Sequence, residues 1–205
     1  MIGVIDYGMG NIASVIDAVE YIGYDAMHCR SPEEIDQCER IIIPGVGSFR
    51  NAMKALNSQG WVAVIREYAN NDRPILGICL GMQLLFGHGY EDGKTDGFGL
   101  ISGEVTHLTP PPPLKVPHVG WNSLNIRSTH PVLKGLKERV DLYFVHSYHC
   151  VPEERECVIA TCTFGNEFVA AAGKNSVLGL QFHPEKSQPS GLRILENFID
   201  WDGTC

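Results

Sequence analysis

In the first half of the chain, the spacing of apolar residues changes repeatedly between the spacing typical of strands and that typical of helices. Short apolar runs alternate there with segments whose apolar residues recur at helical spacing. The runs lie at 2–6, 40–43 and 74–78, and the helical segments lie at 12–22, 51–56 and 62–68. This alternation predicts an α/β fold with parallel strands and right-handed crossovers.

The second half of the chain has a different pattern. Residues 88–99 are rich in glycine and polar residues and are expected to form a loop, followed by short alternating strands over 100–180. The four prolines at 110–113 indicate a surface loop, and the apolar spacing of 191–201 predicts a closing helix. We therefore expect a single α/β domain over 1–205, with a central, mostly parallel sheet flanked by helices and antiparallel strands added in the second half.

The composition restricts the cellular compartment and the kinds of binding partner to be expected. The chain has 205 residues, which fit one sizeable core, and its net charge of -8 argues against binding nucleic acid or an anionic membrane. No apolar stretch reaches the roughly 18 residues that span a bilayer, and the first residues lack a signal-peptide pattern. Seven scattered cysteines suit a reducing compartment. A cytoplasmic protein with small-molecule or protein partners is expected.

The strongest local signal is the run Gly77-Ile78-Cys79-Leu80-Gly81, between an expected strand and an expected helix. It has the form of a nucleophile elbow with cysteine in place of serine, because glycines two residues before and after the centre permit a sharp turn. The N-terminus of the following helix would stabilise a thiolate. The alternative, a small buried core cysteine, is about equally consistent with the pattern.

A second signal, Gln181-Phe182-His183-Pro184-Glu185, follows a late strand. Residues two apart on an extended chain share a face, so a carboxylate at 185 can orient an imidazole at 183. A thiol nucleophile needs a base positioned in this way. Taken alone, an edge histidine with a solvent-facing glutamate is the commoner explanation.

The third signal is the glycine-rich turn Pro44-Gly45-Val46-Gly47, at the end of another expected strand. Without side chains at 45 and 47, the backbone can present N–H groups to an oxyanion. The alternative is a plain turn. Ligands of open α/β sheets bind beyond the carboxyl ends of the strands, where this turn and the elbow would both lie.

Two other readings of the chemistry are weaker. Residues 8–13, GMGNIA, loosely match a dinucleotide fingerprint, but no acidic residue clearly ends the second strand. A zinc deaminase would need a downstream P-C-x-x-C after His183, and only Cys205 follows. The histidines and cysteines between 146 and 162 lack metal-type spacing. We expect no metal and no cofactor.

Five motifs in this order resemble the class I, or triad, glutamine amidotransferases: PGVGSF, GICLGMQLLF, PHVGWN, FVHSY and QFHPEKS. They are spread over nearly the whole chain. The start IDYGMGN and the central PHVGWN are more narrowly similar to the glutaminase subunits of imidazole glycerol phosphate synthase, from histidine biosynthesis. The resemblance implies the class I amidotransferase fold, which has a flavodoxin-like, mostly parallel central sheet flanked by helices.

The resemblance also assigns roles to individual residues. It implies Cys79 as the nucleophile, His183 as the general base and acid, and Glu185 as the orienting carboxylate. Oxyanion donors are expected at Val46, Gly47 and Leu80. The residues expected to bind L-glutamine are Gly45, Gly47, Gln83, Glu91, Ser147 and Tyr148.

The same resemblance implies a partner. Ammonia released into water is mostly protonated, and a chain of this size has no room for a second synthase site. In the resembled family a (β/α)8 cyclase subunit forms a heterodimer with the glutaminase and receives the ammonia. Trp121 and His118 are expected at that interface, although a half-buried core aromatic is an equally common role for Trp121. The alternative acceptor is another synthase, such as one that aminates surface-polysaccharide sugars.

Overall fold

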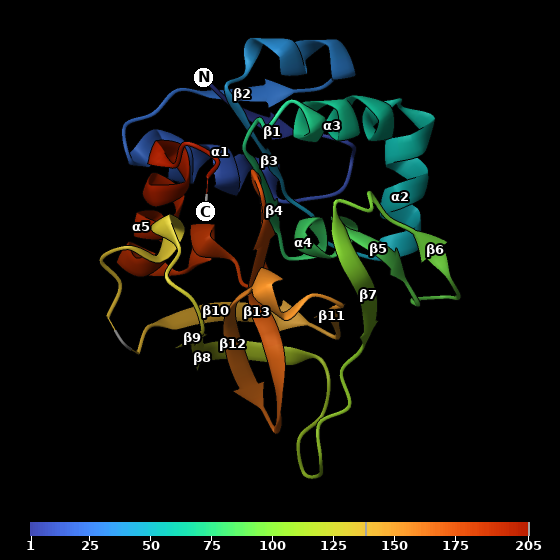
Figure 1. Ribbon diagram of the computed structural model, residues 1–205, viewed down its shortest axis with the longest axis vertical. Coiled ribbons are helices and arrows are strands. Elements are labelled where there is room, and N and C mark those ends of the chain that lie inside the picture. The colour runs from blue at the N-terminus through green and yellow to red at the C-terminus, as the bar shows by residue number, and fades with distance from the viewer. Residues whose placement is uncertain (138, 205) are drawn as a thin grey trace.

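The computed structural model describes residues 1–137 and 139–204. Within them the main sheet has the strand order β2, β1, β3, β4, β14, β13, β12, β9 (Figure 1). Its parallel part consists of β2 (Ala26–Cys29), β1 (Ile2–Ile5), β3 (Arg40–Ile43), β4 (Ile75–Ile78) and β14 (Val177–Leu180). Its antiparallel part consists of β13 (Asn166–Lys174), β12 (Val158–Phe164) and β9 (Asn125–Ile126).

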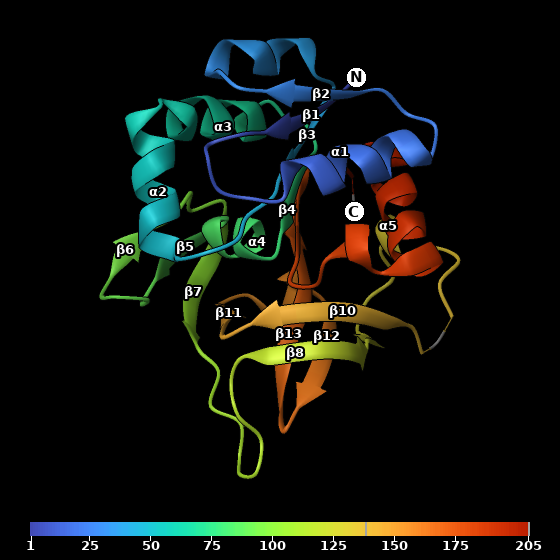
Figure 2. The same ribbon diagram turned by 180° about the vertical axis from the view of Figure 1, so that it is seen from behind.

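Helices cover both faces of the parallel strands. Helices α1 (Ile12–Tyr21) and α5 (Gln188–Asp200) lie on one face, and α2 (Phe49–Ser58) and α3 (Trp61–Asn70) lie on the other (Figure 2). Each face has its own hydrophobic core, one containing Val19 and Phe198 and the other Leu56 and Trp61. Two covered faces explain why β1 and β4 are buried along their whole length and read as continuous apolar runs.

The second half of the chain adds two smaller sheets. One contains β11 (Tyr148–Pro152), β7 (Ile101–His107), β5 (Phe86–Gly89) and β6 (Thr95–Asp96). The other pairs β8 (His118–Ser123) antiparallel with β10 (Asp141–His146). Short 3-10 helices lie at Pro32–Gln37, Pro131–Leu133, Arg155–Cys157 and Pro184–Lys186. The described residues contain no helix that is long and apolar enough to cross a membrane.

The fold confirms the predicted α/β class, the mostly parallel sheet and the added antiparallel strands. One local expectation is wrong. The stretch 88–99, predicted as a loop, contains β6 and the end of β5, because its backbone pairs with neighbouring strands despite its glycines. The expected helix after the elbow is α4 (Leu80–Leu84), and the chain then turns into β5 at Phe86.

Candidate active site

The candidate nucleophile Cys79 lies at a strained turn between β4 and α4. Its φ of 54° and ψ of -108° fall in a region that residues with a side chain rarely adopt. The flanking glycines are required by packing: a Cβ at Gly81 would lie 1.8 Å from the Ile43 carbonyl oxygen, and one at Gly77 would lie 2.6 Å from the Gly81 backbone. The predicted elbow geometry is therefore present at Cys79.

The candidate base and its orienting carboxylate are in direct contact. Nδ1 of His183 lies 2.7 Å from Oε1 of Glu185, and their side chains are 3% and 1% exposed. The expected route to this contact is wrong, since 184–186 form a 3-10 turn instead of an extended segment. That turn is fixed by the Ser187 hydroxyl, which donates to the His183 carbonyl at 2.6 Å.

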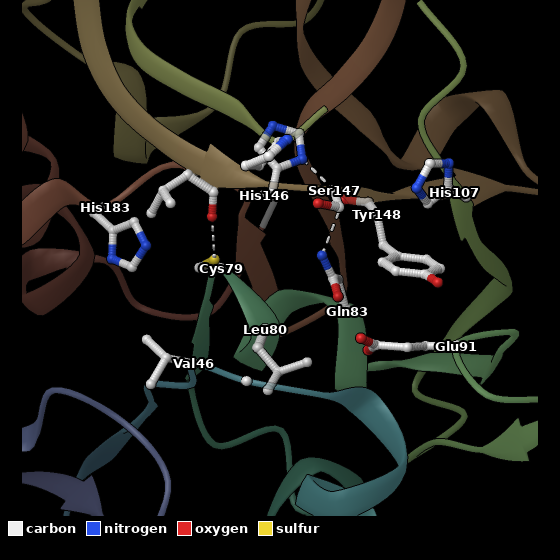
Figure 3. A pocket seen from close by; sticks show the side chains of 13 residues that line it. Val46, Cys79, Leu80, Gln83, Glu91, His107, His146, Ser147, Tyr148 and His183 are labelled. Carbon is white, nitrogen blue, oxygen red and sulfur yellow. Dashed lines mark hydrogen bonds between the residues drawn. The ribbon is translucent and has the colours of Figure 1, made fainter. Parts of the chain in front are cut away.

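The electrostatics of this pair favour a charged imidazole. Burial opposes the charge on His183, but the neighbouring Cys79 and Glu185 stabilise it more strongly and raise the pKa of His183 to about 9. Among the described residues, Nε2 of His183 has no hydrogen-bond partner, and Figure 3 shows the ring beside the Cys79 sulfur. A proton on Nδ1 held by Glu185 leaves Nε2 to exchange a proton with the thiol and its substrate.

The glycine-rich turn lies against the elbow, as expected from its position after β3. The Tyr7 hydroxyl donates to the Pro44 carbonyl at 2.9 Å, and burial followed by the nearby Cys79 raises the pKa of Tyr7 well above its usual value. Gly47 has a φ of +97°, which glycine adopts without strain. Val46, Gly47 and Leu80 all line the pocket. Their roles as oxyanion donors stay a prediction.

A pocket of about 430 Å³ opens above Cys79 and contains most of the residues expected to bind substrate. Figure 3 shows His183 and Val46 on one side of the sulfur, with Glu91 and Tyr148 across the cavity. The lining residues from the predicted set are Val46, Gly47, Cys79, Leu80, Gln83, Glu91, Ser147, Tyr148 and His183. Gly45 does not line the pocket, because it is buried against Tyr7 and Leu80 behind the turn.

Glu91 has a structural contact in addition to its place in the pocket. Its Oε2 accepts a hydrogen bond from the backbone N–H of Phe49 at 2.8 Å. Phe49 begins α2, directly after the glycine-rich turn, so the carboxylate satisfies one of the open N–H groups at the start of that helix. A negative charge here could also meet the ammonium group of an amino acid.

Sequence reasoning gave no site role to several residues at or beside the pocket, among them Gln181, His146 and His107. Gln181 is fully buried and its amide donates to the Cys79 sulfur at 3.8 Å. His146 and His107 line the pocket beside Ser147 and Tyr148. Gln181 directly precedes the Phe182-His183 pair, and that proximity was an available signal. His107 lies at the end of β7, where nothing in the sequence marks it.

The two residues expected at a partner interface differ in exposure. Trp121 is 48% exposed and lies edge-on against Tyr143 of the neighbouring strand. His118 is only 3% exposed and is stacked against Phe144 and Phe164, so its side chain offers no surface to a partner. The exposed residue beside it is Val119, because alternate residues of β8 point to opposite faces.

The remaining cysteines and histidines do not gather into a metal centre. In 1–137 and 139–204 no group of three or more His, Cys, Asp or Glu side chains is arranged to hold a metal ion. Six free cysteines are buried there, and the seventh, Cys205, lies outside the described residues. Burial raises the pKa of the Cys162 thiol to about 12, which suits a core residue better than a nucleophile.

The fold and the site together match a known family of enzymes. Residues 3–201 match the family model described as glutamine amidotransferase class-I. The chain therefore belongs to the class I glutamine amidotransferases. Solved structures titled "Crystal structure of glutamine amidotransferase" and "Structure of PurLQS from Thermotoga maritima" share the fold, with TM-scores of 0.76 and 0.75, identities of 18% and 17%, and 97% of each chain covered.

Within this family, the chain is similar to proteins named imidazole glycerol phosphate synthase subunit HisH. The relative from Desulfitobacterium hafniense is 46% identical over 98% of this chain and 94% of its own length. The relative from Caldanaerobacter subterraneus is 47% identical over 97% of both chains. The relative from Aquifex aeolicus is 44% identical over 95% of this chain and 94% of its own length.

Proposed function

We propose that this chain, as one domain over residues 1–205, is the glutaminase subunit of an imidazole glycerol phosphate synthase. It hydrolyses L-glutamine to glutamate and ammonia and passes the ammonia to a cyclase subunit in a heterodimer. The observation that carries the proposal is the arrangement of Cys79, His183 and Glu185 at the pocket, with 2.7 Å between the imidazole and the carboxylate. Identity near 45% with HisH subunits over nearly the whole chain supports the choice of synthase.

The first half of the reaction forms a thioester. Cys79 attacks the carboxamide carbon of glutamine as a thiolate, with its proton held on Nε2 of His183. N–H groups of Leu80 and of the Val46–Gly47 turn stabilise the oxyanion of the tetrahedral intermediate. His183 then gives its proton to the departing nitrogen, which leaves as ammonia and a γ-glutamyl thioester on Cys79. Its raised pKa keeps this proton available at neutral pH.

The second half releases glutamate. A water molecule attacks the thioester carbon while His183 takes one of its protons, and the proton then returns to the sulfur as the thioester breaks. Glu185 holds the imidazole throughout and balances its positive charge. Free ammonia would be protonated in bulk water, so a partner must receive it directly. The exposed Trp121 and Val119 on β8 are the proposed contact with the cyclase.

The decisive experiment is glutamate release from glutamine by the pure protein, alone and with an imidazole glycerol phosphate cyclase subunit and its nucleotide substrate. Strong stimulation by the loaded cyclase is expected. Glutaminase activity that ignores this cyclase would redirect the search to another ammonia acceptor, such as a sugar-aminating synthase. The absence of activity in every mixture would contradict the proposal.

A second experiment tests the nucleophile directly. A glutamine-like chloroketone should alkylate Cys79 and block glutamate release in proportion to labelling. The buried Cys150 and Cys162 are internal controls, because neither lines the pocket. Peptide mapping that finds the label on another cysteine would refute the assignment of Cys79.

A further inference from the structure

A chain of hydrogen bonds runs from the surface strand β8 to the wall of the pocket. The Asn122 amide nitrogen lies 3.3 Å from Nε2 of His118, and Nδ1 of His118 lies 3.1 Å from Nε2 of His146. Nδ1 of His146 lies 2.8 Å from the carbonyl oxygen of Tyr148. Figure 3 draws the last of these bonds, and Figure 2 shows β8 and β10, which carry the two histidines, side by side. Two buried imidazoles thus connect Asn122 to a pocket-lining residue.

The position of every proton in this chain follows from its two ends. At the inner end, a carbonyl oxygen can only accept, so Nδ1 of His146 carries the proton and its Nε2 is an acceptor. At the outer end, Asn122 must present its nitrogen, because the same nitrogen also donates to the Thr163 carbonyl at 2.9 Å. Nε2 of His118 therefore accepts, and its Nδ1 donates to His146. The assignments from the two ends agree.

The surroundings of the two rings keep both of them neutral. Burial lowers the pKa of His118, and burial of His146 lowers its pKa to about 3, against the smaller opposing effect of the Tyr148 carbonyl. A proton added to Nε2 of His146 would leave two N–H donors facing each other between the histidines. A proton added to Nε2 of His118 would instead face the N–H group of the Asn122 amide. Aromatic rings of Phe144, Phe164 and Phe168 pack against His118.

The inner end of the chain meets the catalytic machinery. The Tyr148 carbonyl accepts a second hydrogen bond, from the Gln83 amide at 3.1 Å. The other hydrogen of that amide points to Gln181 at 3.2 Å, and Gln181 in turn donates to the Cys79 sulfur at 3.8 Å. Both lone pairs of the Tyr148 carbonyl are thereby used, which fixes the orientation of the peptide that follows it.

We propose that His118 and His146 are positioning residues for the glutaminase reaction: their directed hydrogen bonds hold the Tyr148 carbonyl, and with it Ser147, Tyr148 and Gln83, in the arrangement that binds glutamine. This inference rests on the proposed function. It also gives His118 a role, since the ring is too buried to contact a partner directly. The outer end of this hydrogen-bond network is Asn122, which directly follows the exposed Trp121. A partner bound to Trp121 would therefore act on the network at Asn122.

The first test determines which ring nitrogen of His118 and of His146 carries the proton in the wild-type protein. Nitrogen-15 shifts of the histidine side chains distinguish a ring protonated at Nδ1 from one protonated at Nε2 and from the charged form. Both His118 and His146 are expected to be neutral and protonated at Nδ1 at about pH 7.5. A proton on Nε2, or a charged ring, at either residue would overturn the proposal. This measurement needs no variant and does not depend on glutaminase activity.

The second test separates the hydrogen bond from the packing of the ring. His118→Phe keeps an aromatic ring between Phe144 and Phe164 but has no N–H to donate. His118→Asn loses the ring but places an amide N–H where Nδ1 was. In the complex with the cyclase subunit, His118→Phe is expected to lower kcat/KM for glutamine by about tenfold, mainly through KM, and His118→Asn by about twofold.

If only the packing of the ring matters, the order of the two variants is reversed, and His118→Asn is the more impaired one. An active His118→Phe with an impaired His118→Asn would assign the residue to the core and refute the positioning role. His130→Asn is the matched control, because His130 is also buried and burial lowers its pKa to about 4. Its ring lies beside Trp201 and takes no part in the hydrogen bonds that join Asn122 to Tyr148. The kinetics of this variant should equal those of the wild type. A wild-type protein without glutaminase activity would instead contradict the proposed function and leave the proton positions to be judged by the first test.

Discussion

The two walls of the pocket are built in different ways. The elbow wall, residues 44–47 and 77–81, takes its shape from the backbone, with glycines packed where no Cβ would fit. The histidine wall, residues 145–148, His183 and Glu185, takes its shape from hydrogen bonds among buried side chains. A Cβ at Gly81 would overlap a backbone oxygen. The partners of His146, in contrast, are the His118 ring on β8 and the Tyr148 carbonyl at the start of β11.

Because of this difference, the two walls should respond to different kinds of substitution. Adding atoms to the elbow wall should disrupt the fold, because backbone cannot move aside. Substitutions in the histidine wall that exchange a hydrogen-bond donor for an acceptor of the same shape should leave the fold in place. They should change the reaction, because the protons on the neighbouring imidazole nitrogens change position.

The largest effect is expected from Glu185→Gln, in the histidine wall. The glutamine amide would donate to Nδ1 of His183 and force the ring proton onto Nε2, so the imidazole could no longer accept the thiol proton. Steady-state glutamate release with the cyclase present should show kcat reduced by about 10³-fold or more. The melting temperature should stay close to that of the wild type.

A matched measurement guards this interpretation. Synthesis from added ammonium in the same complex should be unchanged, because it bypasses the glutaminase site. Equal loss of glutamine-dependent and ammonium-dependent synthesis would mean that the substitution damages the subunit interface or the fold instead of the proton position.

The next effect is on stability and belongs to the elbow wall. Gly81→Ala would place its Cβ 1.8 Å from the Ile43 carbonyl oxygen and should lower the free energy of unfolding by about 3 kcal/mol or more. Gly173→Ala, in the antiparallel strand β13, would meet the flexible end of Ile159 at 2.9 Å and the Val177 carbonyl oxygen at 3.2 Å, and it should cost about 1 kcal/mol. Denaturant unfolding of both variants measures the difference, and equal losses would refute the contrast between rigid and adaptable regions.

The same contrast explains what the sequence could predict. The elbow wall was predictable because its determinants are local: a strand, glycines at 77 and 81 around Cys79, and a short helix follow one another in the chain. The parallel strands were predictable for a related reason, since burial on two faces produces unbroken apolar runs such as 40–43.

The histidine wall was only partly predictable. His183 and Glu185 are two residues apart, so their contact could be inferred, although the 3-10 turn that creates it was not. The contact of His118 with His146 joins residues 28 positions apart through the register of β8 and β10, and no local pattern encodes that register. His118 was consequently expected at the surface with Trp121, and the alternation of the strand places it inside.

A smaller effect should appear when the pH is lowered. His146 has a folded pKa of about 3, below the ordinary value of 6.5, so between these values the unfolded chain binds the proton more tightly. Its contribution to stability is therefore present above about pH 6.5 and is lost as the pH falls towards 3. Going from about pH 7.5 to 5 should cost ~2 kcal/mol through this residue.

Unfolding by guanidinium at the two pH values measures this loss. A His146→Asn variant removes the titrating group but keeps a donor to the Tyr148 carbonyl, so its stability should fall by ~2 kcal/mol less than that of the wild type over the same interval. Identical pH dependence in the two proteins would show that His146 is not held neutral in the fold.

The smallest effect is expected in the elbow wall, at the buried hydrogen bond between Tyr7 and Pro44. Tyr7→Phe removes the hydroxyl that donates to the Pro44 carbonyl at 2.9 Å, at a cost of about 1 kcal/mol in stability. The loosened turn should lower kcat for glutamine hydrolysis about fivefold with KM unchanged, because oxyanion donors act only on the transition state. A raised KM with normal kcat would mean that the turn binds glutamine in its ground state, and the elbow wall would then share the binding role assigned here to the histidine wall.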